Sequence, residues 1–227
     1  MRINTWIAGI VAATLLGGPA FAQTGETPTK PETSPEAGAN KADGNADKAE
    51  GGANDADKSP DLDADAAARA THLDELLRRL SDPEAKDWQR VQAQVIQAWN
   101  RSGSASMDLL AQRADKALEK KDYDTALIHL NDLVRLAPDY AEGWNKRATI
   151  HFLKQDYGPS LEDIARVLKL EPRHFGALSG LGIILDRIGD PKGALEAYRR
   201  AIAINPHLPG IKDGIKKLEK QVEGERL

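Results

Sequence analysis

The side chains that usually carry out chemistry in proteins are few in this sequence, and their spacing does not favour a reactive site. The chain has five histidines and no cysteine, which excludes disulfides, thiolate zinc sites, cysteine nucleophiles and lipid-modified cysteines. No histidine is followed four positions later by a second metal-ligand residue, as the zinc-binding motif HExxH requires. No histidine lies near a candidate nucleophile either. We therefore predict no metal, no cofactor and no catalytic residue.

The glycine-rich run GALSGLG, residues 176–182, resembles a phosphate-binding loop in composition only. Phosphate loops follow a strand and open a helix, whereas this run lies within a helical pattern. We expect its glycines to thin the helix surface for packing or for an incoming ligand. The abundant carboxylates fall at solvated helix positions, so we predict that the protein is not an enzyme. The opposite hypothesis would need a buried titratable pair that the pattern does not reveal.

The composition favours an all-helical protein and argues against binding of nucleic acid. Charged residues make up 29% of the 227 residues and aromatic residues only 5%, whereas sheets are enriched in β-branched and aromatic residues. The formal net charge is −4. Because phosphate binding needs a basic surface, we predict no nucleic-acid partner.

Residues 1–22 have the pattern of a secretory signal peptide. Arg2 provides a positive charge, Trp6 to Leu16 form a short apolar region, and Ala20-Phe21-Ala22 matches the A-x-A cleavage motif. We predict cleavage after Ala22, with the mature protein in the periplasm if the source is a Gram-negative bacterium and without membrane insertion. The alternative is an uncleaved membrane anchor, against which the shortness of the apolar run argues.

Residues 23–66 are predicted to be a disordered acidic linker. This segment has eleven acidic residues against four lysines and little apolar surface, so burial cannot offset the entropy lost on ordering. It is interpreted as a solvated spacer, with attraction of a basic partner as the alternative.

From residue 67 onward the apolar residues recur at helical spacing. Residues 67–103 are predicted to form an N-terminal helical hairpin, with a capping box at Ser81-Asp82-Pro83-Glu84 opening its second helix. The hairpin is interpreted as a divergent cap on the units that follow it. Residues 207–227 contain an apolar stripe with lysines opposite and are predicted to form a C-terminal capping helix.

Between these ends, several columns of residues repeat with a period of 34. Prolines recur with this period, as do small residues in two columns and the aspartates Asp122, Asp156 and Asp190. The aspartates are placed to accept hydrogen bonds from free N–H groups at a helix start, and the prolines to end a helix. Small residues let two antiparallel helices approach, as we expect for Gly182 facing Ala194. Tyr198 is then expected to fill the volume toward the neighbouring hairpin.

These columns resemble the tetratricopeptide repeat, a helix–turn–helix unit of 34 residues. The resemblance implies an all-α solenoid of three repeats within residues 104–206, at about 107–138, 141–172 and 175–206. The segments WNRSGSASMDLL, APDYAEGWNKRAT and EPRHFGALSGLG also resemble secreted repeat proteins of alphaproteobacteria. The residues that match the repeat signature are Ala114, Ala126, Pro138, Trp144, Ala148, Pro172, Gly182, Ala194, Tyr198, Ala201 and Pro206.

In this family the first helix of each repeat lines a concave groove, and the resemblance therefore implies a binding surface for a protein or peptide partner. The family's clamp for a terminal carboxylate uses lysines, an arginine and asparagines, but among the clamp positions here only Lys146 is basic, so that clamp is absent. An extended peptide or a partner helix fits the groove instead. The predicted groove residues are Asp115, Glu142, Asn145, Lys146, Thr149, Phe152, Ser179, Ile183 and Asp186.

Together these patterns lead to the hypothesis of a non-enzymatic periplasmic scaffold that binds a protein segment in its groove. Two alternatives remain open at this point. One is a membrane-tethered assembly factor with a retained N-terminal anchor. The other is a regulatory subunit or cofactor protein of a cell-envelope enzyme.

Overall fold

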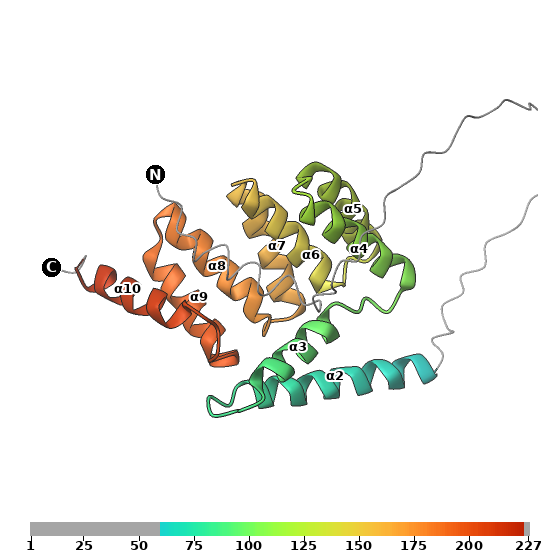
Figure 1. Ribbon diagram of the computed structural model, residues 1–227, viewed down its shortest axis with the longest axis horizontal. Helices are drawn as coiled ribbons and strands as arrows, with labels where there is room; N and C mark the ends of the chain where they lie inside the picture. The colour runs from blue at the N-terminus through green and yellow to red at the C-terminus, as the bar shows by residue number, and fades with distance from the viewer. Residues whose placement is uncertain (1–59, 225–227) are drawn as a thin grey trace, which may run out of the picture.

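The computed structural model describes residues 60–224, and this part of the chain consists of helices joined by short turns (Figure 1). No strand occurs within the described range. The all-α fold predicted from the sequence is therefore confirmed. The helices are α2 (Pro60–Leu80), α3 (Trp88–Trp99), α4 (Ala105–Glu119), α5 (Tyr123–Leu136), α6 (Ala141–Leu153), α7 (Tyr157–Leu170), α8 (Phe175–Ile188), α9 (Pro191–Ile204) and α10 (Ile211–Gly224).

Three antiparallel helix pairs stack side by side, as a tetratricopeptide-type solenoid requires. The pairs are α4 with α5, α6 with α7, and α8 with α9, and α10 packs on α9 at the C-terminal end. The second helix of each pair ends two residues before Pro138, Pro172 or Pro206, because proline cannot continue helical hydrogen bonding. The predicted three-repeat register and C-terminal capping helix are thus present.

The turn inside each repeat uses the left-handed region of backbone space at one repeated position. Lys121, Gln155 and Gly189 have φ values of 59°, 65° and 86°. The next residue is the predicted N-cap aspartate. Asp122 accepts from Thr125 N at 3.1 Å and Asp190 accepts from Gly193 N at 2.9 Å. Asp156 makes no such side-chain bond, so the capping prediction is wrong for the middle repeat.

The approach of the two helices within a repeat depends on paired residue sizes. Alanine occupies the small position of the first two repeats, where it shares a core with Leu130 or Ile164. The third repeat has Gly182 and, in the partner column, Tyr198. A Cβ added at Gly182 would overlap the Tyr198 ring. The Tyr198 ring therefore fills the space beside Gly182, and its other edge lies against Gly214 of α10, as the sequence predicted for a residue that reaches the neighbouring helix.

The N-terminal hairpin is present, but its boundaries differ from the prediction. Helix α2 begins at Pro60, so residues 60–66, assigned to the acidic linker, belong to a helix. The capping box at Ser81 does not form. Helix α3 begins only at Trp88, and Asp82 instead accepts from Glu84 N at 2.9 Å within the connecting turn.

The hairpin packs against the third repeat. Its interpretation as a cap on the units that follow it had suggested packing against the first repeat. Trp88 stacks on His207 in the turn before α10, with ring centroids 4.9 Å apart. Arg173, in the turn before α8, donates to Asp74 of α2 at 2.7 Å. Leucines and valines of α2 and α3 share one buried core with α8, α9 and α10. The hairpin therefore lies beside the edge of the solenoid where α8 begins (Figure 1).

The predicted signal peptide, residues 1–22, and the remaining part of the predicted acidic linker, residues 23–59, lie outside the described residues. Within residues 60–224, no helix has the length and apolar character needed to cross a membrane.

Candidate functional site

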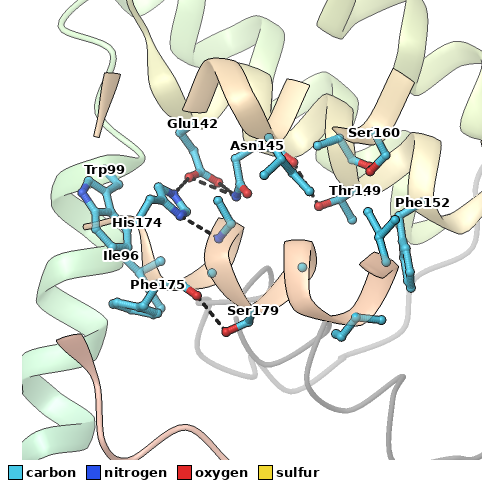
Figure 2. A pocket seen from close by; sticks show the side chains of 17 residues that line it. Ile96, Trp99, Glu142, Asn145, Thr149, Phe152, Ser160, His174, Phe175 and Ser179 are labelled. Atoms are coloured by element: carbon cyan, nitrogen blue, oxygen red, sulfur yellow. Dashed lines mark hydrogen bonds and ion pairs between the residues drawn. The ribbon is translucent and has the colours of Figure 1, made fainter. Parts of the chain in front are cut away.

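A pocket opens between the first helices of the second and third repeats, α6 and α8, with α3 of the N-terminal hairpin forming one wall (Figure 2). Six of the nine predicted groove residues meet here. They are Glu142, Asn145, Thr149, Phe152, Ser179 and Ile183.

The other three predicted groove residues lie outside this pocket and are held by ion pairs. Lys146 is 5% exposed, and its ammonium donates to both carboxylate oxygens of Asp115, at 2.9 and 3.1 Å. Asp186 accepts from Lys217 of α10 at 3.3 Å. The single basic residue at the clamp positions is thus neutralised by its neighbour in the first repeat.

A buried hydrogen-bonded pair, Glu142 and His174, forms the inner corner of the pocket. Glu142 is 5% exposed and His174 is 3% exposed. The amide N–H of Ala177 donates to Nδ1 of His174 at 3.1 Å, so the ring proton resides on Nε2. Nε2 then donates to Oε2 of Glu142 at 3.1 Å, and Asn145 donates to the same carboxylate at 3.2 Å.

The pKa of Glu142 lies below its ordinary value of 4.5 although the side chain is buried. Burial is the largest influence and raises the pKa, but the hydrogen bond from His174 and the nearby charge of Lys146, together with the Asn145 amide, lower it by more. The pocket corner therefore carries a negative charge at neutral pH.

The pocket walls are apolar, and their hydroxyl groups are already engaged. Thr149 donates to the carbonyl of Asn145 at 3.0 Å, and Ser179 donates to the carbonyl of Phe175 at 2.7 Å. Gly176 and Gly180 also line the pocket on the α8 side, where they contribute backbone only. Phe152 lies at the far end from Trp99 (Figure 2). Such a cavity suits an apolar side chain next to an amide or carboxylate hydrogen-bonding group.

Sequence reasoning missed His174, Trp99 and Ile96 as pocket residues. His174 stands directly before α8 and serves as its N-cap, a role the search for metal-binding histidine spacing could not detect. Trp99 and Ile96 come from the hairpin, which no repeat pattern places at this site.

The buried Glu142–His174 pair is the type of titratable pair that an enzyme would need. Here, however, His174 uses one nitrogen to cap a helix and the other to bind Glu142, so both ring nitrogens are occupied. Within the described range, no group of three histidine or acidic residues is arranged to hold a metal ion.

A family model for the tetratricopeptide repeat matches residues 154–209, and related chains extend the match. A tetratricopeptide repeat-containing protein of Rhizobium etli is 41% identical over 157 residues, which cover 68% of this chain and 76% of the relative. The chain therefore belongs to the tetratricopeptide repeat family, whose members are generally non-enzymatic interaction modules.

Solved structures agree with this fold. The tetratricopeptide domain of Sgt2 from Aspergillus fumigatus is similar with a TM-score of 0.50 at 22% identity, over 54% of this chain and 83% of that one. The first such domain of Spaghetti, solved with the HSP90 peptide SRMEEVD, is similar with a TM-score of 0.50 at 16% identity, over 52% and 93%.

Proposed function

We propose that this protein is a non-enzymatic scaffold that binds a segment of a partner protein in its concave groove, with the α6–α8 pocket as the main anchor site. The observation that carries the proposal is the convergence of six groove residues on one cavity with aromatic and aliphatic walls. Binding energy at such surfaces is concentrated where an apolar side chain enters a well-packed pocket.

The charges of the groove argue against a clamp for a terminal carboxylate. Lys146 forms an ion pair with Asp115, so its charge is already neutralised. Glu142 is ionised at the pocket corner. An incoming carboxylate would meet a like charge, whereas an apolar side chain with a backbone N–H donor would meet a complementary surface. The proposed ligand is therefore an internal, largely uncharged segment.

We also propose that the protein works in the periplasm of a Gram-negative bacterium. This part of the proposal rests on the n-region, the apolar run and the A-x-A motif at Ala20–Ala22. Expression of the full chain in such a host, followed by N-terminal sequencing of the osmotic-shock fraction, tests it. A mature protein that starts at Gln23 is expected, and an intact membrane-bound chain would instead support the retained anchor.

Groove binding is tested by selecting peptides from a displayed library of random dodecapeptides on the purified chain. Selected peptides are then synthesised and titrated calorimetrically against wild type, Asn145→Ala and Phe152→Ala. Each substitution should weaken binding about tenfold, as expected for residues at a binding hot spot. The matched control is Ile128→Ala, on the exposed side of α5, which should leave the affinity unchanged. Equal affinity in all four proteins would rule out the groove.

A further inference from the structure

The N-terminal hairpin reaches the binding pocket itself. Trp99 and Ile96 of α3 line the same cavity as Asn145, Phe152 and Ile183. Figure 2 shows Trp99 beside His174 at one end of the pocket and Phe152 at the other. The sequence between α3 and α8 contains two complete repeats, so this juxtaposition is not a consequence of the repeat pattern.

Resting on the proposed function, we infer that α3 is a built-in wall of the binding site, and that Trp99 sets which side chain of a partner segment the pocket accepts. The Trp99 ring stacks on the His174 imidazole with centroids 4.2 Å apart and planes 14° apart. It also contacts Phe175, with centroids 4.9 Å apart. These contacts fix the indole on the side of the pocket where the ionised Glu142 lies.

The hairpin is held in this place by polar contacts as well as by its core. Asn205, in the turn after α9, donates to Gln92 of α3 at 2.7 Å. The imidazole of His207 lies 3.0 Å from the carbonyl oxygen of Asp82. Together with the Arg173–Asp74 ion pair, these contacts tie the hairpin to the turns before α8 and before α10. Because α3 is attached at several points, it forms a rigid wall of the pocket. A rigid wall lets the pocket select among the side chains of partner segments.

The shape of the cavity indicates the ligand class. Trp99, Phe175, Phe152 and Ile183 provide apolar walls, and Gly176 contributes only its backbone on α8. One aliphatic or aromatic side chain of a partner segment would enter between them, and its backbone would meet the amide of Asn145. Because Ile96 and Trp99 of the hairpin line this end of the pocket, the partner segment would turn away from the groove near Trp99.

The selection of dodecapeptides described above tests this inference when it is repeated on Trp99→Ala. Peptides selected on wild type should share one medium-sized apolar residue. They should bind Trp99→Ala about tenfold more weakly, while peptides selected on Trp99→Ala should carry a larger side chain at that position. This change in preference reports on pocket shape, which general loosening of the fold would not alter. Ile96→Ala provides a second, milder variant if Trp99→Ala does not fold.

Gln97→Ala is the matched control, because Gln97 lies on the exposed face of the same helix α3 and does not line the pocket. The affinity of this variant for the peptides should stay within about twofold of wild type. Unchanged or tighter binding by Trp99→Ala would overturn the inference, as would an equal loss in Gln97→Ala. If Asn145→Ala weakens binding and Trp99→Ala does not, the inference alone fails. If neither variant matters, the proposed function fails with it.

Discussion

Nε2 of His174 donates to the buried carboxylate of Glu142 at 3.1 Å, and this bond joins the start of α8 to the first turn of α6. The pair links two successive repeats through their first helices, at the corner of the binding pocket. It also explains how a carboxylate with 5% exposure remains ionised.

We predict that Glu142→Gln destabilises the protein by about 1–3 kcal/mol at neutral pH, because a charged hydrogen-bonding group is lost from a buried site. The folded-state pKa of Glu142 is depressed, so its stabilising contribution is present above the ordinary value of 4.5 and is lost as the pH falls through the folded-state pKa. Urea unfolding across this range should therefore show the two proteins converging in acid. A difference that stays constant with pH would contradict the assignment.

The His174 cap predicts different outcomes for two substitutions. His174→Ala removes the acceptor for Ala177 N–H and the bond to Glu142, and should cost about 3 kcal/mol, measured as the free energy of unfolding. His174→Asn keeps a side chain that can cap a helix and should recover about 1 kcal/mol of that loss. Equal stability of the two variants would show that capping by His174 is unimportant.

The pairing of Gly182 with Tyr198 predicts a compensating double substitution. Gly182→Ala should cost about 1–3 kcal/mol through overlap with the Tyr198 ring. In a Tyr198→Ile background, the same substitution should instead stabilise by about 1 kcal/mol, because alanine favours helix and the middle repeat already pairs Ala148 with Ile164. Chemical unfolding of wild type, the two single variants and the double variant gives the coupling energy between the two positions. A coupling energy near zero would contradict the pairing.

The left-handed turn residues predict a stabilising substitution. Gln155 has φ of 65°, which costs a non-glycine residue about 1 kcal/mol, so Gln155→Gly should raise the free energy of unfolding by about 0.5–1 kcal/mol. Gly189→Ala, at the same position of the next repeat, should lower it by a similar amount. Thermal unfolding of both variants checks the opposite signs.

An ion pair between the two helices of the second repeat predicts a large effect at a buried carboxylate. Arg147 donates to both oxygens of Asp163, at 2.9 and 2.7 Å, and also to Asn131 at 3.0 Å. Asp163→Ala should cost about 3 kcal/mol, since it leaves the guanidinium without its partner. Asp132→Ala, which breaks an exposed pair with Arg135, should cost less than about 0.5 kcal/mol.

The repeat architecture could be predicted because each repeat is specified locally. Proline, aspartate and small residues recur every 34 positions and decide where helices start, stop and approach. Six of the pocket residues could be named for the same reason. The position of the hairpin could not, because Trp88 and Trp99 have the spacing of any amphipathic helix. Their partners, His207 and His174, are aromatic stacking partners that no periodicity indicates.

The hairpin also changes how the repeats depend on one another. In a simple repeat array each unit contacts only its neighbours, and the ends can fray separately. Here Asp74 and Gln92 of the hairpin bind residues 99 and 113 positions away in the sequence. The hairpin and the third repeat therefore stabilise each other directly, although two repeats separate them in the sequence. Deletion of the N-terminal hairpin would therefore destabilise the third repeat, at the other end of the solenoid.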